Sequence, residues 1–476
     1  MGESKERNLD LRLTLLLFAI IGATGFHWLI LRLRIPVLDA MPDWKFTINA
    51  ISINHLWIAL AFFAFGLALI LSFSKINYAP KIFFLILFGV IIQLSLAYSK
   101  GQGLDGIRNR ILASGHTEFA RVAVEQPDTW YILLNYEDLA AKQKYDYIPS
   151  KPPGTLLFYK LTDNISGMLM PASDLETRLN NLGTLASFAW PVISYFVLIP
   201  LFYFSREFLK DSDMAVITCL FFMTVPSFNL ITLHTDQVLF PVLALTPMLM
   251  TVIAFRKGNL LLAALCGAAL YLTAYFSFGL AVVGILLPML ILIEIQTGKF
   301  RALAYSIKYG CAVVAGIVLS DVFARVFLNY DILVRYNLAM THHALWRNWE
   351  NTMSTYLRAG VTTVTEFFIW LGLPLTVLFL TGMGVSIYQQ IIRKPTVMSY
   401  YDMSLAGIFV FLLLFSKTKV ESARLWLFLV PFVCLSVSNF INQQNWRKSS
   451  KLIFVIVVLM LELGTTYFTL HYQDFQ

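Results

Sequence analysis

Long apolar runs separated by short polar segments make up most of the chain. Thirteen of them have roughly the 17 to 25 residues that a helix needs to cross a lipid bilayer. The pattern predicts an all-α polytopic membrane protein, a single domain over 1–476 with about thirteen transmembrane helices. The runs lie at about 13–31, 56–74, 81–98, 182–204, 214–232, 238–255, 259–277, 279–296, 305–328, 360–385, 403–416, 424–442 and 451–469.

The longest polar stretch, 114–159, could not lie in a bilayer. Its Thr117–Glu125 part has helical periodicity, with Phe119 and Val122 on one face and Glu118 on the opposite face. The stretch therefore predicts a large loop that carries short amphipathic helices.

A proline pair follows in the same stretch. The sequence Ser150-Lys151-Pro152-Pro153-Gly154 cannot be helical at its centre, because a proline forces the residue before it into an extended conformation. The apolar segment Thr155–Leu161 comes next, and a polar segment, 162–181, is expected to lead into the fourth run.

Composition excludes several classes of protein. With 58% hydrophobic and 13% charged residues, the chain has too many apolar runs for a soluble globular core. The net charge of +8 does not indicate a nucleic-acid partner, because the basic residues are scattered singly between apolar runs. The four cysteines lie inside apolar runs, which argues against a disulfide framework or a zinc site. The sequence also contains no glycine-rich phosphate loop, HExxH or GxSxG motif.

Basic residues favour one orientation in the membrane. With a cytoplasmic N-terminus, every cytoplasmic loop carries at least two Lys or Arg residues, as the positive-inside rule requires. The run 13–31 has no small-residue cleavage site after it and is expected to be a retained helix. The segments 99–181 and 329–359 then lie on the extracytoplasmic side, where we expect the chemistry.

Lys151 is the most informative charged residue of that side. An ammonium held by two prolines beside an apolar segment is a fixed point charge for a phosphate or diphosphate. A solvated lysine in a proline-rich turn is the alternative, and the turn alone does not separate the two.

Two elements together resemble a known family. An acidic-aromatic helix start, His116-Thr117-Glu118-Phe119-Ala120-Arg121-Val122-Ala123, precedes an extended segment and then the Lys151-Pro152-Pro153 turn. This order is similar to the aminoarabinose lipid A transferases and the wider protein O-mannosyltransferase-like branch of the GT-C superfamily. Those proteins are membrane glycosyltransferases that use polyprenyl-phosphate sugars. The resemblance covers about fifty residues by motif and the rest of the chain by hydropathy.

The resemblance implies a reaction and a set of partners. A sugar would move from a polyprenyl-phosphate donor to a glycan, lipid or protein acceptor, with inversion at the anomeric carbon. The setting would be a bacterial inner membrane, with the active site on the extracytoplasmic side and membrane lipids around it. No cofactor follows with certainty, although a divalent cation stays open.

The same resemblance assigns roles within the motif. A carboxylate takes the acceptor proton, and cations stabilise the departing phosphate. Where the family has its usual catalytic aspartate this chain has Gly115, so Glu118 is our first candidate for the base and Asp105 the second. Lys151 is the expected phosphate contact, and His116 is a further candidate for substrate binding.

More substrate-binding candidates lie outside the motif. The turn 417–424 adds Lys419 and Arg424 as candidate phosphate contacts and Glu421 as a further candidate for substrate binding. Glu421 and Arg424 stand three apart, so an ordinary ion pair at a helix end is the alternative. Asp236 lies in a short external turn, where it would bind the acceptor or cap the helix that follows.

The external segment 329–359 contributes His342, His343 and Arg347. Their tryptophan neighbours give a mixture of flat rings and polar groups that suits sugars and lipid headgroups, and an aromatic belt is the alternative. Adjacent histidines point apart on a helix and no third ligand follows them, which disfavours a metal site.

Charged residues inside apolar runs need partners. Asp321 and Arg325 stand four apart and are expected to pair, whereas Glu366 and Glu462 have no evident partner in the sequence. Two other functions stay open: a transporter or flippase of a lipid-linked sugar, and an inactive subunit, which the glycine at Gly115 favours. Against transport, the hydropathy shows no inverted repeat with matched broken helices.

Overall fold

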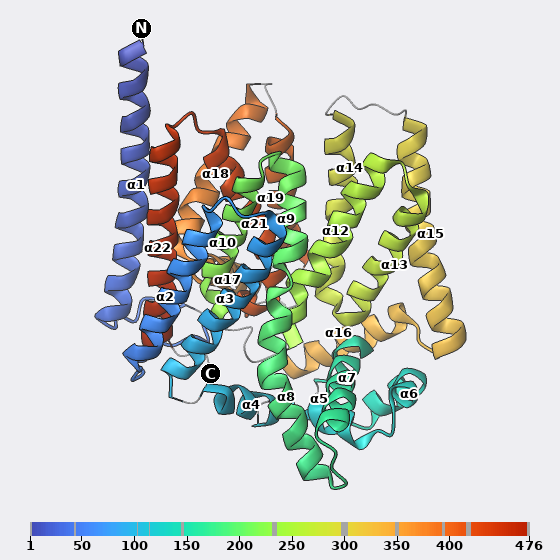
Figure 1. Ribbon diagram of the computed structural model, residues 1–476. Coiled ribbons are helices and arrows are strands. Elements are labelled where there is room, and N and C mark those ends of the chain that lie inside the picture. Colours follow the sequence, from blue (N-terminus) through green and yellow to red (C-terminus); the bar gives the residue numbers. More distant parts are fainter. Residues whose placement is uncertain are drawn as a thin grey trace. The chain divides into compact units, whose positions relative to one another are not determined.

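The computed structural model describes residues 2–41, 44–101, 103–113, 115–143, 147–230, 236–296, 303–347, 352–392, 396–415 and 420–473. Over these residues the secondary structure is helical, apart from one isolated β-bridge between Ile48 and Gln473 (Figure 1). This confirms the predicted all-α fold class. The chain packs into two compact units, which are described separately here.

Unit 1 comprises Met1–Gly101, Tyr195–Thr232 and Tyr356–Gln476. Its long helices include α1 and α22, which pack against each other although they lie near opposite ends of the sequence. The helices are α1 (Gly2–Arg32), α2 (His55–Ser72), α3 (Tyr78–Ser99), α9 (Leu198–Leu209), α10 (Ser212–Thr224), α11 (Pro226–Leu230), α17 (Met353–Leu371), α18 (Leu373–Ile391), α19 (Val397–Phe415), α20 (Ser422–Leu425), η4 (Leu427–Leu429), α21 (Val430–Gln443) and α22 (Lys448–Tyr472).

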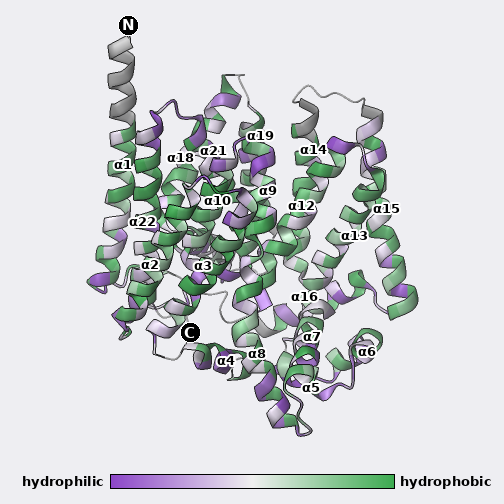
Figure 2. Ribbon diagram, viewed as in Figure 1, coloured by the Kyte–Doolittle hydropathy of each residue, from purple (hydrophilic) through white to green (hydrophobic). Residues whose placement is uncertain are grey.

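Unit 2 comprises Gln102–Ser194 and Leu233–Thr355. Apolar helices α12 to α15 run side by side, and the more polar helices α4 to α7 lie together near one end of them (Figure 2). The helices are α4 (Gly103–Ala113), α5 (Thr117–Glu125), α6 (Thr129–Ala141), α7 (Pro153–Leu169), α8 (Leu175–Tyr195), η2 (Asp236–Leu239), α12 (Phe240–Lys257), α13 (Leu260–Phe276), η3 (Phe278–Ile285), α14 (Leu286–Gln296), α15 (Leu303–Leu328) and α16 (Ile332–Arg347).

Each apolar run of the sequence coincides with helix, but the count of thirteen spans is not confirmed. Among the described residues, eight helical segments are long and apolar enough to cross a membrane, or nine if a bent pair counts as one span. Four further apolar helices are shorter, at 10–17 residues. The chain is therefore a multi-pass membrane protein in which several runs are too short as helices to cross unaided.

The run 360–385 is not one straight helix. It breaks at Gly372 into α17 and α18, which meet at 114°. Gly372 has a φ of +97°, and a Cβ there would overlap the carboxylate of Glu462. That carboxylate also accepts a hydrogen bond from the Leu375 backbone N–H at 3.4 Å. The sequence did not reveal a partner for Glu462. In the structure this partner is the first turn of α18, where N–H groups without an acceptor inside the helix favour a carboxylate.

In unit 2 the α13 and α15 backbones touch through two glycines. A Cβ at Gly267 would overlap the Val313 carbonyl, and one at Gly316 would overlap the Ala264 carbonyl. Small residues let membrane helices approach this closely. Farther along α15, the predicted pair forms, with the Arg325 Nε 2.7 Å from the Asp321 Oδ2.

Helix α7 is longer than the sequence pattern predicts. It continues through Leu169 because a buried ion network satisfies the polar residues that were expected to begin a loop. The Asp163 carboxylate lies 2.9 Å from both the Lys160 ammonium and the Arg178 guanidinium, and Lys160 also donates to the Gln126 carbonyl. The network ties α7 to α8 and to the end of α5.

Candidate active site

Helix α5 begins where the hydrophobic pattern places it. It spans Thr117–Glu125, the predicted range, and buries Phe119 and Val122 as expected. Glu118, on the opposite face of the helix, is buried as well. Its carboxylate Oε2 accepts a hydrogen bond from the Ile148 backbone N–H at 3.1 Å. Glu118 therefore holds the loop that leads to Lys151.

Two further side chains hold the same loop. The Tyr136 hydroxyl of α6 lies 3.1 Å from the Ile148 carbonyl and 2.9 Å from the Lys151 carbonyl. The Arg335 guanidinium of α16 donates to the Pro149 carbonyl at 2.9 Å. Three helices thus fix the backbone that carries Lys151, and α7 starts directly after it at Pro153, as the proline pair predicts.

Asp236 is the carboxylate on which the site converges. It is fully buried, with Oδ2 lying 3.2 Å from the Lys151 ammonium and Oδ1 lying 3.3 Å from the His116 Nδ1. These contacts join positions 116, 151 and 236, which come from three separate parts of the sequence. A buried carboxylate needs such partners, because an unpaired charge in an apolar interior is costly.

Aromatic rings pack beside the charge cluster of His116, Lys151 and Asp236. The Lys151 ammonium lies 5.0 Å from the centre of the Phe119 ring, a cation–π distance. Phe119 stacks on Tyr159, which packs edge-on against Trp190. Burial raises the pKa of the Tyr159 hydroxyl, so it stays protonated at physiological pH.

The space of the family's aspartate is filled by another residue. A Cβ at Gly115 would lie 2.5 Å from the ring of Tyr147, which also packs near the His116 ring. A larger side chain at Gly115 would have to displace this ring. The carboxylate that meets His116 and Lys151 in this structure is that of Asp236.

Arg335 also pairs with a carboxylate of α6. Its Nη1 lies 3.0 Å from the Glu137 Oε2. Burial raises the pKa of the Glu137 carboxyl, and the nearby Arg335 guanidinium offsets part of that rise. The arginine thus bridges Glu137 and the Lys151 loop, which makes it a support of the site that the sequence did not reveal.

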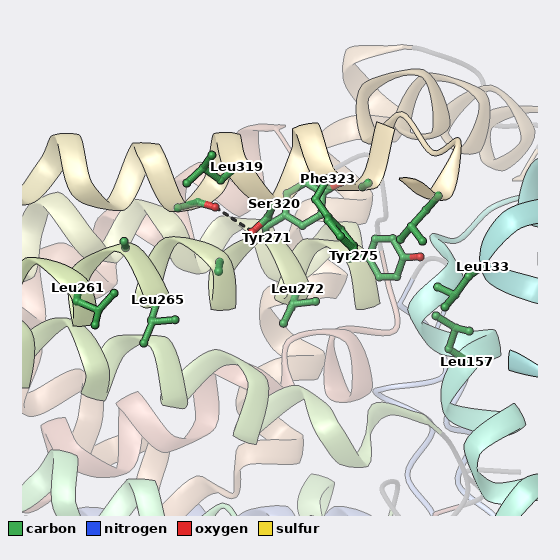
Figure 3. Close-up of a pocket in the computed structure, with 15 residues that line it drawn as sticks. Leu133, Leu157, Leu261, Leu265, Tyr271, Leu272, Tyr275, Leu319, Ser320 and Phe323 are labelled. Carbon is green, nitrogen blue, oxygen red and sulfur yellow. Dashed lines mark hydrogen bonds between the residues drawn. The ribbon is translucent and has the colours of Figure 1, made fainter. Parts of the chain in front are cut away.

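An apolar groove of about 610 Å³ opens along α13 and α15 (Figure 3). Tyr271, Tyr275 and Leu272 line it from α13, and Leu319 and Phe323 line it from α15. At one end it reaches the site's own helices, where Leu133 of α6 and Leu157 of α7 complete the wall. Helix α7 packs tightly on this end, because a Cβ at Gly154 would lie only 2.6 Å from the Phe276 backbone.

No protein-family model and no curated protein matches the chain. Among solved structures, the chain is similar to the Archaeoglobus fulgidus oligosaccharyltransferase bound to Zn and sulfate, with a TM-score of 0.48 and 12% identity. The apo form gives a TM-score of 0.46 at 13% identity, and each alignment covers 81% of this chain. A third similar structure is the archaeal oligosaccharyltransferase AglB from Archaeoglobus fulgidus, in complex with an inhibitory peptide and a dolichol-phosphate. It has a TM-score of 0.42 and 12% identity over 76% of this chain.

The chain spans about half the length of these structures, with 52% to 56% of each covered.

The other predicted site residues of unit 2 lie in different settings. Asp105 points outward from α4, with 76% of its side chain exposed and the Arg108 guanidinium 3.2 Å away. His342 and His343 are half-buried near the end of α16, and Arg347 is the last residue of that helix. The residue of α16 that contacts the Lys151 loop is Arg335, about two turns before the histidines.

The predicted phosphate contacts of the 417–424 turn belong to unit 1. Lys419 lies outside the described residues. Glu421 and Arg424 form the ion pair that the sequence offered as the alternative, with the Arg424 Nε 3.0 Å from the Glu421 Oε2. Lys45, which the sequence did not single out, lies on the other oxygen of the same carboxylate.

Among the residues that the structure describes around Asp236, a divalent cation finds no complete ligand set. An ammonium already lies on this carboxylate, and one imidazole and one carboxylate are fewer ligands than a protein site usually provides. Over the residues that the structure describes, no group of three or more His, Cys, Asp or Glu side chains could hold a metal ion. We therefore derive no step through a metal.

Proposed function

We propose that the protein is a membrane glycosyltransferase that moves a sugar from a polyprenyl-phosphate donor to an acceptor hydroxyl on the extracytoplasmic side. The observation that carries this proposal is the position of Lys151. Its ammonium is fixed at a buried carboxylate, directly before a helix whose first turns line a large apolar groove. A cation beside an apolar groove suits a ligand with a phosphate head and a hydrocarbon chain.

The phosphate end is assigned to Lys151. The ammonium donates to the Asp236 carboxylate at 3.2 Å, and a fixed point charge at this place suits a phosphate oxygen. Because Glu118, Tyr136 and Arg335 fix its backbone, the lysine does not have to reorganise when charge develops on the leaving group. Preorganised charge of this kind is the usual main source of transition-state stabilisation.

The hydrocarbon end is assigned to the groove. From Pro153 to Leu157, four steps along α7 cover about 6 Å of the helix axis at 1.5 Å per residue. A lipid phosphate at Lys151 can therefore extend its chain past Leu157 and Leu133 onto α13 and α15. Large exposed apolar residues such as Leu319 and Phe323 flank this path, as expected for a face that meets lipid.

Proton transfer is assigned to the His116 and Asp236 pair. Asp236 stabilises a proton on the His116 Nδ1, which places the lone pair of the neutral imidazole on Nε2. The acceptor hydroxyl gives its proton to this pair as its oxygen bonds to the anomeric carbon. The bond from that carbon to the phosphate oxygen breaks, and the polyprenyl phosphate leaves with the electron pair beside Lys151. Attack from the opposite side inverts the anomeric configuration.

The purified protein in liposomes that contain polyprenyl-phosphate-linked sugars tests this proposal. A panel of sugars and of hydroxyl acceptors is offered, and release of free polyprenyl phosphate is followed together with the glycosylated acceptor. We expect both products from the wild type and at least a 100-fold loss in Lys151→Met and Asp236→Asn. Movement of the intact donor across the bilayer without cleavage would instead identify a transporter.

A further inference from the structure

Asp402 is a buried carboxylate that the reaction above does not use. It lies in α19, within a segment long and apolar enough to cross a membrane, and only 2% of the residue is exposed. The Ser386 hydroxyl of α18 donates to its Oδ2 at 2.5 Å, and the Ser436 hydroxyl of α21 donates to its Oδ1 at 2.6 Å. Three helices of unit 1, which pack against one another, thus meet at this carboxylate.

Other buried carboxylates of the chain have partners of a different kind. The Asp163 carboxylate lies 2.9 Å from the Lys160 ammonium. Glu366 and Glu462 accept hydrogen bonds from backbone N–H groups. Over the residues that the structure describes, Asp402 has neither kind of partner, and the two serine hydroxyls are its donors. Hydroxyl groups are neutral, so they leave the negative charge of the carboxylate in place.

The hydrogen bonds of Asp402 fit an ionised carboxylate. Both distances fall in the range of about 2.5 to 2.7 Å for hydroxyls that donate to a charged oxygen. Because one hydroxyl donates to each oxygen, the carboxylate is an acceptor on both sides. An ionised carboxylate in a membrane-spanning segment is costly unless a positive charge lies beside it. A cation bound at this place would supply that charge.

The same side chains provide ligands for such a cation. Two carboxylate oxygens and two hydroxyl oxygens come together, from α18, α19 and α21. A hydroxyl oxygen that donates its hydrogen keeps its lone pairs, and each carboxylate oxygen accepts more than one partner. The group carries a single negative charge. A monovalent cation would therefore make it neutral, whereas a divalent cation would leave a positive charge buried in the membrane.

We infer that Asp402, Ser386 and Ser436 form a binding site for a small monovalent cation such as Na⁺. The cation bonds to oxygens of all three side chains, so that it links α18, α19 and α21 of unit 1 and keeps the carboxylate ionised. This site does not depend on the proposed glycosyl transfer, and the two can fail separately.

Thermal unfolding of the full-length protein in nanodiscs tests the site. Tm is measured in NaCl and in choline chloride at equal ionic strength, because choline is too large for a buried site. A ligand that binds only the folded protein raises Tm, so we expect the wild type to have a Tm about 2 °C or more higher in NaCl. Asp402→Asn should abolish this difference. The matched control is Asp163→Asn, which should keep the difference even where its own Tm is lower.

Two serine variants test the ligands without removing the charge. Ser386→Ala and Ser436→Ala each lack one oxygen, so we expect the Na⁺ concentration that gives half of the Tm rise to increase about 10-fold. Equilibrium binding of radiolabelled Na⁺ should be lost in Asp402→Asn and kept in Asp163→Asn. An effect of Na⁺ that survives in Asp402→Asn would overturn the inference. So would a wild-type Tm that is equal in both salts and falls as the pH rises, because a bound proton would then neutralise Asp402.

Discussion

The carboxylate of Glu118 accepts the backbone N–H of Ile148 at 3.1 Å, three residues before Lys151. This contact changes the role expected for the most prominent acid of the sequence motif. Glu118 supports the loop that carries the lysine, while the lysine itself meets Asp236. The two acids should therefore respond differently to the same chemical change.

Conversion of each acid to its amide separates the two roles. Asp236→Asn cannot stabilise a proton on His116, so we expect kcat to fall by about 10²-fold or more. Glu118→Gln keeps an oxygen that can accept from Ile148, so we expect a loss of no more than about 10-fold, mainly in KM. Steady-state kinetics with a lipid-linked sugar measure both.

Asp105→Asn is the control for this pair, because that carboxylate lies exposed on α4. It should have the kinetics of the wild type. A severe defect in Asp105→Asn or in Glu118→Gln, together with a mild one in Asp236→Asn, would instead identify that acid as the base.

Replacement of Lys151 tests charge against packing. We expect Lys151→Met to remove about 2 to 4 kcal/mol of transition-state stabilisation. It should also lower the free energy of unfolding by up to about 3 kcal/mol, because the buried Asp236 carboxylate loses the ammonium that lies beside it. Thermal unfolding in detergent and kcat/KM measure the two effects.

A double variant separates these effects. In Lys151→Met with Asp236→Asn the buried charge is gone, so Tm should recover toward the wild-type value while activity stays lost. Recovery of activity together with Tm would show that Lys151 serves the fold alone.

Local periodicity was sufficient for part of this site. The pattern of Phe119 and Val122 predicted α5 residue by residue, and the proline pair predicted where α7 starts. The carboxylate that meets Lys151 lies 85 residues away in the sequence. Periodicity indicates only local structure, so it cannot identify such a partner. The motif contains Glu118 and therefore favoured it as the base, whereas Asp236 was predicted only to bind the acceptor or to cap a helix.

Buried charges within apolar runs show the same limit. Glu366 and Glu462 were recognisable as residues that need partners, but their partners are backbone N–H groups 57 and 87 residues away. Backbone donors carry no sequence signal. Arg335 was missed for a related reason, since its acceptor is the Pro149 carbonyl.

The groove predicts a dependence on lipid chain length. Ala268→Phe places a large ring in the groove wall, so we expect KM to rise about 10-fold for a long-chain donor and less than 2-fold for a short-chain analogue. Leu260→Phe adds a ring to the same helix outside the groove and should affect neither donor. An equal effect of Ala268→Phe on both donors would argue that the chain binds elsewhere.

Arg335 supplies a test of preorganisation that leaves every reacting group in place. Its planar guanidinium reaches the Glu137 carboxylate and the Pro149 carbonyl at once, which a lysine ammonium cannot reproduce with the same geometry. In Arg335→Lys we expect faster hydrogen–deuterium exchange over 147–151 and a loss of about 1 to 3 kcal/mol in kcat/KM, the range for a hydrogen bond to a charged group.

Arg325→Lys is the matched control, because that arginine pairs with Asp321 and Asp331 at the more exposed end of α15. If Arg335→Lys loosens the loop and activity is unchanged, a rigid Lys151 is not required for the reaction. If the two lysine variants lose activity equally, the defect comes from the charge network of unit 2 and not from the Lys151 loop.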